Sequence, residues 1–100
     1  MNEEVIRWST KVLRFLAIRP RSEQEITDYL KRKNAPPEIH SGVINYFIEQ
    51  KLLDDVEFAR WYLRSRQIMH PKSEQVLKYE LKNKGISEAI IATVFAESDN

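Results

Sequence analysis

Lysine and arginine side chains gather in three segments of this chain, where their charges could bind phosphate groups. Two of the segments hold Lys31, Arg32, Lys33, Lys78, Lys82 and Lys84. Cations near the end of a helix complement its dipole, which is the ordinary interpretation of such a group. The alternative is a pair of basic patches, spaced to follow a phosphate backbone and tolerant of its sequence. Both interpretations stay open at this point.

The third segment combines arginine with an aromatic residue. Arg60, Arg64 and Arg66 fall within seven residues, and Trp61 lies beside the first of them. On a helix, Arg60 and Arg64 are one turn apart and share a side. An arginine next to an exposed aromatic ring suits stacking on a base or on a protein surface. The alternative is that Trp61 is partly buried between two modules.

Other residues that could do chemistry have simpler structural roles. The acids of 54–57 are expected to cap the start of a helix, because carboxylates there accept free N–H groups and complement the dipole. His40 and His70 lie 30 residues apart, which is not a ligand spacing. Ser22 and Ser73 have no obvious base with an orienting acid nearby in sequence and are expected to be caps. We therefore expect no enzyme, no metal and no cofactor.

Charge is distributed unevenly along the 100 residues, although the net charge is only +1. Residues 7–33 carry eight Lys/Arg against three acids, and residues 58–84 carry seven against two, so each stretch has a balance of +5. Residues 34–57 hold one Lys and five acids, a balance of −4. Two basic stretches around an acidic one suit contact with a polyanion or an acidic protein surface.

The two basic stretches belong to an internal repeat with a period of 51 residues. Aligned without a gap, Pro20–Ile44 and Pro71–Phe95 are identical at nine of 25 positions. A repeat near this length indicates helical modules, each a small supersecondary unit. Such modules usually present a surface to a large partner.

Helical spacing and capping residues predict six helices. Ser22 with Glu25 forms a capping box, and Ser73 and Ser87 are further N-caps. Helix ends are expected at Asn34 and Gly85, residues that tolerate a left-handed backbone. The predicted starts, with Pro36-Pro37 opening the third helix, are near Glu3, Ser22, Pro36, Asp54, Ser73 and Ser87.

The fold class predicted from these signals is all-α, with two tandem three-helix repeats of helix-turn-helix type. The expected modules are residues 1–53 and 54–100. The strongest apolar stripe belongs to the third helix and consists of Ile39, Val43, Ile44, Phe47 and Ile48. The chain has no cysteine, no secretion signal and no apolar run of roughly 20 residues. We therefore expect a cytoplasmic protein.

The order of these motifs resembles the RecX family over about residues 12–95. The first module carries Leu13–Leu16, Arg19-Pro20-Arg21-Ser22, and the run from Ile44 to Asp55 with Phe47-Ile48-Glu49-Gln50-Lys51-Leu52-Leu53. The second carries Asp55-Val56-Glu57-Phe58-Ala59-Arg60, followed by Tyr62-Leu63 and Arg66. Lys72-Ser73, Leu81-Lys82 and Lys84-Gly85-Ile86 continue the match.

The resemblance implies a regulator of the RecA recombinase, active in DNA repair and the SOS response. Such proteins are all-α, need no cofactor, bind the RecA–DNA filament through a basic face and suppress recombination. The partner implied is thus the RecA filament, with contact to single-stranded DNA left open, no membrane, and a monomeric state. The candidate residues carried over are Arg60, Arg64, Arg66, Lys72, Lys78, Lys82 and Lys84. The family usually has three modules, and this chain matches the first two.

Two other functions remain open on the sequence. One is a winged helix-turn-helix DNA-binding domain, in which Ile39–Ile48 would enter the major groove and two strands would follow Leu53. That helix carries no lysine or arginine, and a capped amphipathic helix is predicted after Leu53. The other is a helical protein-interaction module without nucleic-acid contact.

Overall fold

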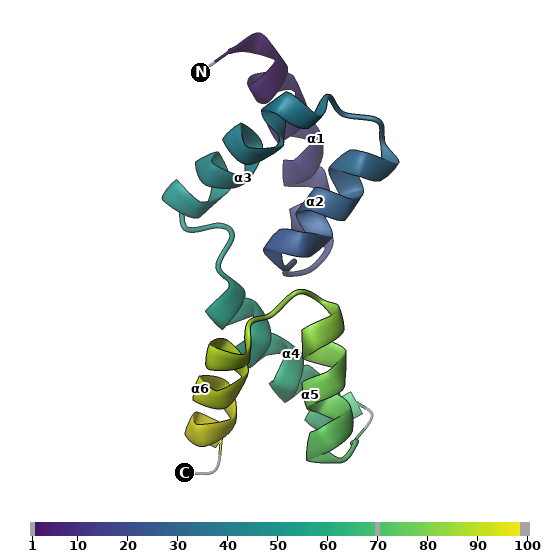
Figure 1. The fold of residues 1–100 in the computed structure, drawn as a ribbon, viewed down its shortest axis with the longest axis vertical. Helices are drawn as coiled ribbons and strands as arrows, with labels where there is room; N and C mark the ends of the chain where they lie inside the picture. The colour runs from purple at the N-terminus through teal and green to yellow at the C-terminus, as the bar shows by residue number, and fades with distance from the viewer. Residues whose placement is uncertain (1, 70, 99–100) are drawn as a thin grey trace. The chain divides into compact units, whose positions relative to one another are not determined.

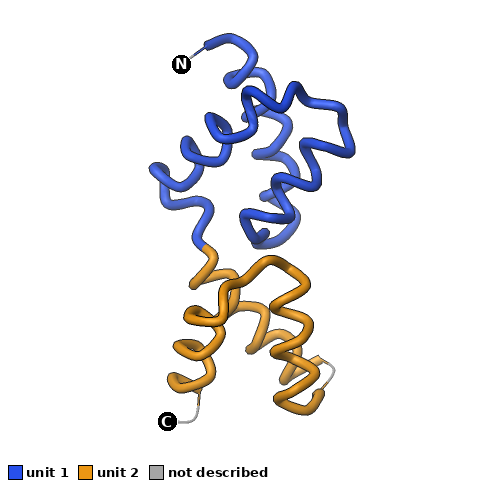
Figure 2. The backbone as a smooth tube through the Cα atoms, in the orientation of Figure 1, with its two compact units in different colours: residues 1–54 blue, residues 55–100 orange. Residues whose placement is uncertain are grey.

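Six α-helices and one short 3₁₀ helix, with no strand, make up the described part of the chain, residues 2–69 and 71–98, in the computed structural model (Figure 1). The predicted all-α class is confirmed. The chain divides into two compact units, Met1–Asp54 and Asp55–Asn100, which Figure 2 shows in two colours. None of the described helices combines the length and apolar character needed to cross a bilayer.

Unit 1 consists of α1 (Glu3–Ile18), α2 (Glu23–Arg32), the 3₁₀ helix η1 (Pro37–Ile39) and α3 (His40–Glu49). Helix α3 packs on both α1 and α2. Its approach to α1 depends on Gly42, because a Cβ at that position would lie 3.1 Å from Val5 Cγ2. The buried core of this unit is Val5, Trp8, Val12, Ile26, Leu30, Ala35, Ile39, Val43, Phe47 and Leu53.

Unit 2 consists of α4 (Asp55–Met69), α5 (Glu74–Asn83) and α6 (Glu88–Ser98). All three helices contact one another. The helix after Leu53 excludes the winged alternative, which required two strands there. The core of this unit is Phe58, Ala59, Leu63, Leu77, Leu81, Ile86, Ile91, Val94 and Phe95.

Serine hydroxyls cap three of the helices, as predicted. Ser22 Oγ accepts a hydrogen bond from Glu25 N at 3.1 Å, and the Glu25 carboxylate accepts one from Ser22 N at 3.1 Å. Ser73 and Ser87 each accept from the amide three residues on, at 3.3 and 3.2 Å. The Ser22 cap is fully buried, whereas Ser73 is exposed. The two equivalent serines of the repeat therefore cap their helices in different environments.

Left-handed residues end three of the helices. Asn34 and Gly85 have φ values of 63° and 82°, in agreement with the predicted helix ends. The next amide in each case returns to a leucine carbonyl: Ala35 N to Leu30 O at 2.9 Å, and Ile86 N to Leu81 O at 3.1 Å. This is the hydrogen-bond pattern of a Schellman turn. A third such turn follows α3, where Lys51 has a φ of 61°.

Two details of the third helix differ from the prediction. Pro37 opens a 3₁₀ turn, and regular α-helix begins only at His40, whose amide donates to the Pro37 carbonyl. Ile48, predicted to belong to the buried stripe, is 40% exposed. Phe47 fills the core at the end of this helix, and its neighbour Ile48 therefore lies off the buried side.

The buried cap generates a testable prediction. Ser22→Ala removes the acceptor for Glu25 N and leaves that amide without its partner, so unfolding of the protein should become easier by about 1–2 kcal/mol. Ser73→Ala is the matched control in the repeat, and its exposed amide can turn to water, so its cost should be about 0.5 kcal/mol. Urea denaturation followed by circular dichroism measures both. Equal costs for the two variants would contradict the assigned role of burial.

Candidate functional site

Arg60 of α4 is held by carboxylates of its own unit. Its Nε and Nη2 donate to Glu97 Oε2 and Oε1 at 2.8 and 2.7 Å, and its Nη1 bonds Glu57. These hydrogen bonds raise the pKa of Arg60 above its ordinary value and lower the pKa of Glu97. The bidentate pair joins α4 to α6. The positive charge of Arg60 is consequently neutralised by carboxylates within unit 2.

Arg66 is engaged in the same way with α5. Its Nε and Nη2 donate to the two oxygens of Glu80 at 3.1 and 3.0 Å. The Tyr62 hydroxyl donates to Glu80 Oε1 at 2.7 Å. The hydrogen bond from Tyr62, followed by the interactions with Arg66, lowers the pKa of the Glu80 carboxyl. This three-residue network ties α4 to α5.

The other two candidates on α4 differ from each other. Trp61 is half-buried against the core of unit 2, with its ring 5.8 Å from that of Phe58 and 6.4 Å from that of Tyr62. Trp61 therefore packs within unit 2. Arg64 is exposed, and no described carboxylate forms a salt bridge with it. Arg64 is therefore the α4 candidate whose charge faces solvent.

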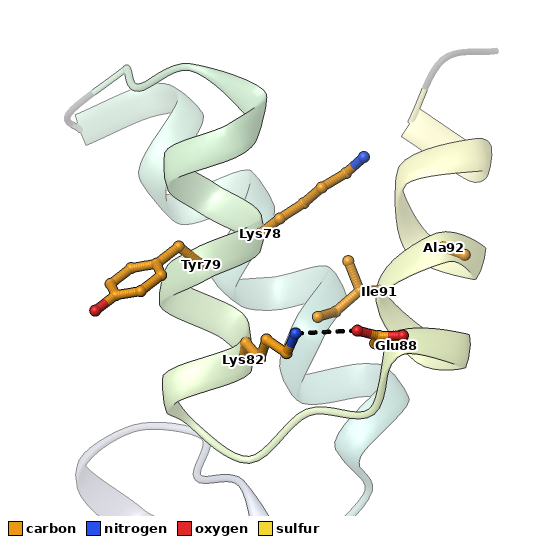
Figure 3. Close-up of a pocket in the computed structure, with 6 residues that line it drawn as sticks. All are labelled: Lys78, Tyr79, Lys82, Glu88, Ile91 and Ala92. Carbon is orange, nitrogen blue, oxygen red and sulfur yellow. Dashed lines mark hydrogen bonds and ion pairs between the residues drawn. The ribbon is translucent and has the colours of Figure 1, made fainter.

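Lysines and an exposed aromatic come together on α5. Lys78, Tyr79 and Lys82 line a shallow cavity of about 400 Å³, which Glu88, Ile91 and Ala92 of α6 complete (Figure 3). We call these six residues the α5–α6 face. Tyr79 is 66% exposed. Figure 3 shows its ring pointing away from α6, while Lys82 reaches toward Glu88.

The lysines of this face have only loose partners. Lys82 Nζ lies 3.0 Å from Glu88 Oε1, but both side chains are well exposed, at 64% and 82%. Lys78 Nζ lies 3.9 Å from Glu74 Oε2 and 5.2 Å from the centre of the Phe95 ring. Exposed pairs of this kind contribute little and open readily. Both lysines thus remain available to an incoming anion.

The remaining candidates lie outside this face. Lys72 is exposed ahead of α5, and its charge contributes to the lowered pKa of Glu80. Lys84 is half-buried at the end of α5, where its amide donates to carbonyls of the last turn. In unit 1, the end of α2 exposes Lys31, Arg32 and Lys33.

Tyr79 was missed by the sequence analysis. In sequence it lies midway between Leu77 and Leu81, which are buried, so on the helix it projects to a different side. That position predicts exposure, because the two leucines define the buried side of α5. The sequence pattern that could have identified it is an aromatic residue with Lys78 directly before it and Lys82 three residues after it.

Residues that could have supported other chemistry have structural roles wherever the structure describes them. His40 Nε2 lies 3.1 Å from the Ala35 carbonyl oxygen, and His70 lies outside the described residues. Within residues 2–69 and 71–98, no group of three or more His, Asp or Glu side chains is arranged to hold a metal ion. The acids at the start of α4 occupy its first turn, where a negative charge complements the dipole.

Comparison with known families matches both units. Residues 10–47 match a model described as RecX, first three-helix domain, and residues 54–94 match RecX, second three-helix domain. Together the two models account for most of the chain.

Similar curated proteins carry the same name. A regulatory protein RecX of Geobacillus sp. (strain WCH70) is 40% identical over 86 residues, which cover 86% of this chain and 32% of that protein. A regulatory protein RecX of Mycolicibacterium smegmatis is 31% identical over 87 residues, covering 87% of this chain and 46% of the relative. The chain thus spans between about a third and a half of these relatives.

Solved structures with a similar fold have the same name. One, a crystal structure of regulatory protein RecX, has a TM-score of 0.89 at 24% identity and matches 95% of this chain and 48% of the other. The RecX structure from Lactobacillus salivarius has a TM-score of 0.86 at 24% identity, with 96% of this chain and 62% of that one covered. At this identity the comparison establishes the fold.

The Glu80 network predicts how acid affects unit 2. The folded state lowers the pKa of Glu80, so its network contributes stability above the pKa of the unfolded state, and this contribution is lost as pH falls through the folded pKa. Glu80→Gln should therefore be less stable than the wild type at pH 7, and the difference should shrink toward pH 3. Urea midpoints at both pH values test this, with Glu74→Gln as the exposed control. A difference that is independent of pH would contradict it.

Proposed function

The chain belongs to the RecX family, and on that premise we propose that it binds the RecA–DNA filament and lowers recombinase activity. The α5–α6 face would supply the main contact in unit 2, assisted by Arg64 and Lys72. In this proposal the protein is a monomer, acts in the cytoplasm and needs no cofactor. The proposal is supported by the relatives, which are called regulatory proteins.

One observation carries the choice of the α5–α6 face. Tyr79 is 66% exposed on the same helix as Lys78 and Lys82, whose ion pairs are exposed. An exposed ring on a helix that also carries lysines can stack on a base or on a protein surface while the lysines approach phosphates or carboxylates. By contrast, two of the α4 arginines, Arg60 and Arg66, already bind carboxylates of unit 2.

Arg60 and Arg66 accordingly have a supporting role in this proposal. Replacing either would leave a carboxylate of α5 or α6 without its cation and would weaken the packing of the helices. If such variants bound more weakly, the cause could be either a distorted unit 2 or a lost contact with the partner. The lysines of α5 give a cleaner test because they are exposed.

The second candidate function is a protein-interaction module without nucleic-acid contact. The pairing of Lys82 with Glu88 and of Lys78 with Glu74 favours it, since these pairs must open before an anion can bind. An interface of this type would use Tyr79 and Ile91 as apolar anchors and would be less sensitive to salt. Salt dependence therefore separates the two candidates.

The proposal predicts the behaviour of Lys78→Gln/Lys82→Gln. Loss of two phosphate contacts should reduce the dependence of log affinity on log salt by about 1.4, since each single-strand phosphate contributes about 0.7. Binding to RecA filaments on single-stranded DNA should weaken by about tenfold or more at 0.1 M salt. Tyr79→Ala should weaken binding with little change in the salt dependence.

Filament binding is measured by fluorescence anisotropy and recombinase inhibition by the rate of ATP hydrolysis. Arg7→Gln/Lys51→Gln is the control: it removes the same number of charges from exposed positions of unit 1. Unchanged ATP hydrolysis at saturating wild-type protein would count decisively against the proposed function. Equal weakening in the control would show that net charge, and not this face, determines binding.

A further inference from the structure

Lys82 and Glu88 face each other across the turn between α5 and α6. Lys82 Nζ donates a hydrogen bond to Glu88 Oε1 at 3.0 Å, and Figure 3 shows this contact on the α5–α6 face. Lys78, the other lysine of this face, forms an ion pair with Glu74 at 3.9 Å, which is longer than a hydrogen bond. The two lysines therefore differ, because Lys82 holds a carboxylate of its own unit more closely than Lys78 does.

The turn fixes the main chain on both sides of this pair. Gly85 has a φ of 82°, and its amide donates to the Lys82 carbonyl at 3.0 Å. The next amide, that of Ile86, donates to the Leu81 carbonyl at 3.1 Å, and both of these residues are buried in the core of unit 2. Since the core already holds the backbone here, formation of the pair orders only the two charged side chains.

The ends of the two helices favour each member of the pair separately. Lys82 belongs to the last turn of α5, and Glu88 belongs to the first turn of α6. A helix dipole favours a cation at its C-terminal end and an anion at its N-terminal end. The Glu88 carboxylate is thus stabilised near its present position even when Lys82 is bound elsewhere. An anion that approaches Lys82 must displace this carboxylate and is repelled by it.

We infer that Glu88 is an autoinhibitory residue of the α5–α6 face: its carboxylate holds Lys82 in the free protein and lowers the affinity of the face for an anionic partner. The inference rests on the proposed function for the identity of that partner, the RecA–DNA filament, and adds a residue that opposes binding. Both side chains are well exposed, at 64% and 82%, so the pair is weak. The reduction in affinity is therefore modest, about threefold.

A general effect of charge would act differently from this competition. Removal of any acid raises the net charge and favours a polyanion, whichever residue is replaced. Competition requires the lysine, so loss of the Glu88 carboxylate should strengthen binding only while Lys82 is present. A double-mutant cycle separates these two effects, because it isolates the pairwise interaction.

The test measures binding of the full chain to RecA filaments on single-stranded DNA, by fluorescence anisotropy at about 0.1 M salt. Glu88→Gln should bind about threefold more tightly than the wild type. Glu38→Gln, which removes one exposed carboxylate from unit 1, is the matched control and should stay within about 1.5-fold of the wild type because distant exposed charges are screened. In the Lys82→Gln background, adding Glu88→Gln should change the affinity by less than about 1.5-fold. Circular dichroism verifies that the variants are folded.

Two results would overturn the inference. The first is equal strengthening by Glu88→Gln with and without Lys82, which would show a general effect of charge. The second is an affinity that Glu88→Gln leaves unchanged while Lys82→Gln weakens binding, which would show that the carboxylate does not compete for a lysine that the partner uses.

Inorganic polyphosphate separates this inference from the proposed function. It carries closely spaced phosphates without bases or a protein surface, and calorimetry measures its binding to the same variants. Where filaments bind, their cycle decides the inference; where they do not, the polyphosphate cycle decides it. A wild type that fails to bind filaments, together with the expected dependence of Glu88→Gln on Lys82 in polyphosphate, would contradict the proposed function alone. A wild type that binds neither ligand would contradict both.

Discussion

Both units depend on a tight turn that joins a helix end to the buried core. After α2 and after α5, a residue in the left-handed region reverses the chain, and the next amide bonds a leucine carbonyl one turn back. Leu30 and Leu81, which supply these carbonyls, are fully buried, and Ala35 and Ile86, which supply the amides, belong to the buried cores. The turn and the core therefore form together: a change that opens the turn also removes an apolar contact between its two ends. In units of about 50 residues, whose cores are small, such coupling matters more than in larger domains.

The cations of unit 2 differ in their burial and in their partners. The two α4 arginines that bond carboxylates lie at the contacts of α4 with α5 and α6, where their bidentate pairs have a structural role. The lysines of α5 project into solvent, with partners too exposed to hold them firmly. In unit 1, Arg19 likewise binds the Glu25 carboxylate, while Lys11 and Arg21 lie over aromatic rings. A basic sequence can therefore produce three kinds of cation: one that joins helices, one that is exposed in a weak ion pair, and one that lies over an aromatic face.

Local signals explain why the fold could be predicted from the sequence. Ser22 and Glu25 lie three residues apart and form their capping box within one helical turn, so the pattern alone identifies it. Asn34 and Gly85 likewise fulfil a local backbone requirement. The candidate site was harder, because the partner of Arg60 is 37 residues away and that of Arg66 is 14. No local pattern in the sequence assigns such pairs.

The turn after α3 restricts what can replace Lys51. Its backbone has a φ of 61°, and the following amide bonds the carbonyl of the buried Phe47 at 2.9 Å. Nothing in the side chain's charge is needed for that geometry, so glycine or asparagine should be accepted, whereas valine and isoleucine would strain the main chain. The residue types accepted at position 51 in natural variants of this protein should therefore be those that tolerate a left-handed backbone. This restriction comes from the fold and does not depend on any binding partner.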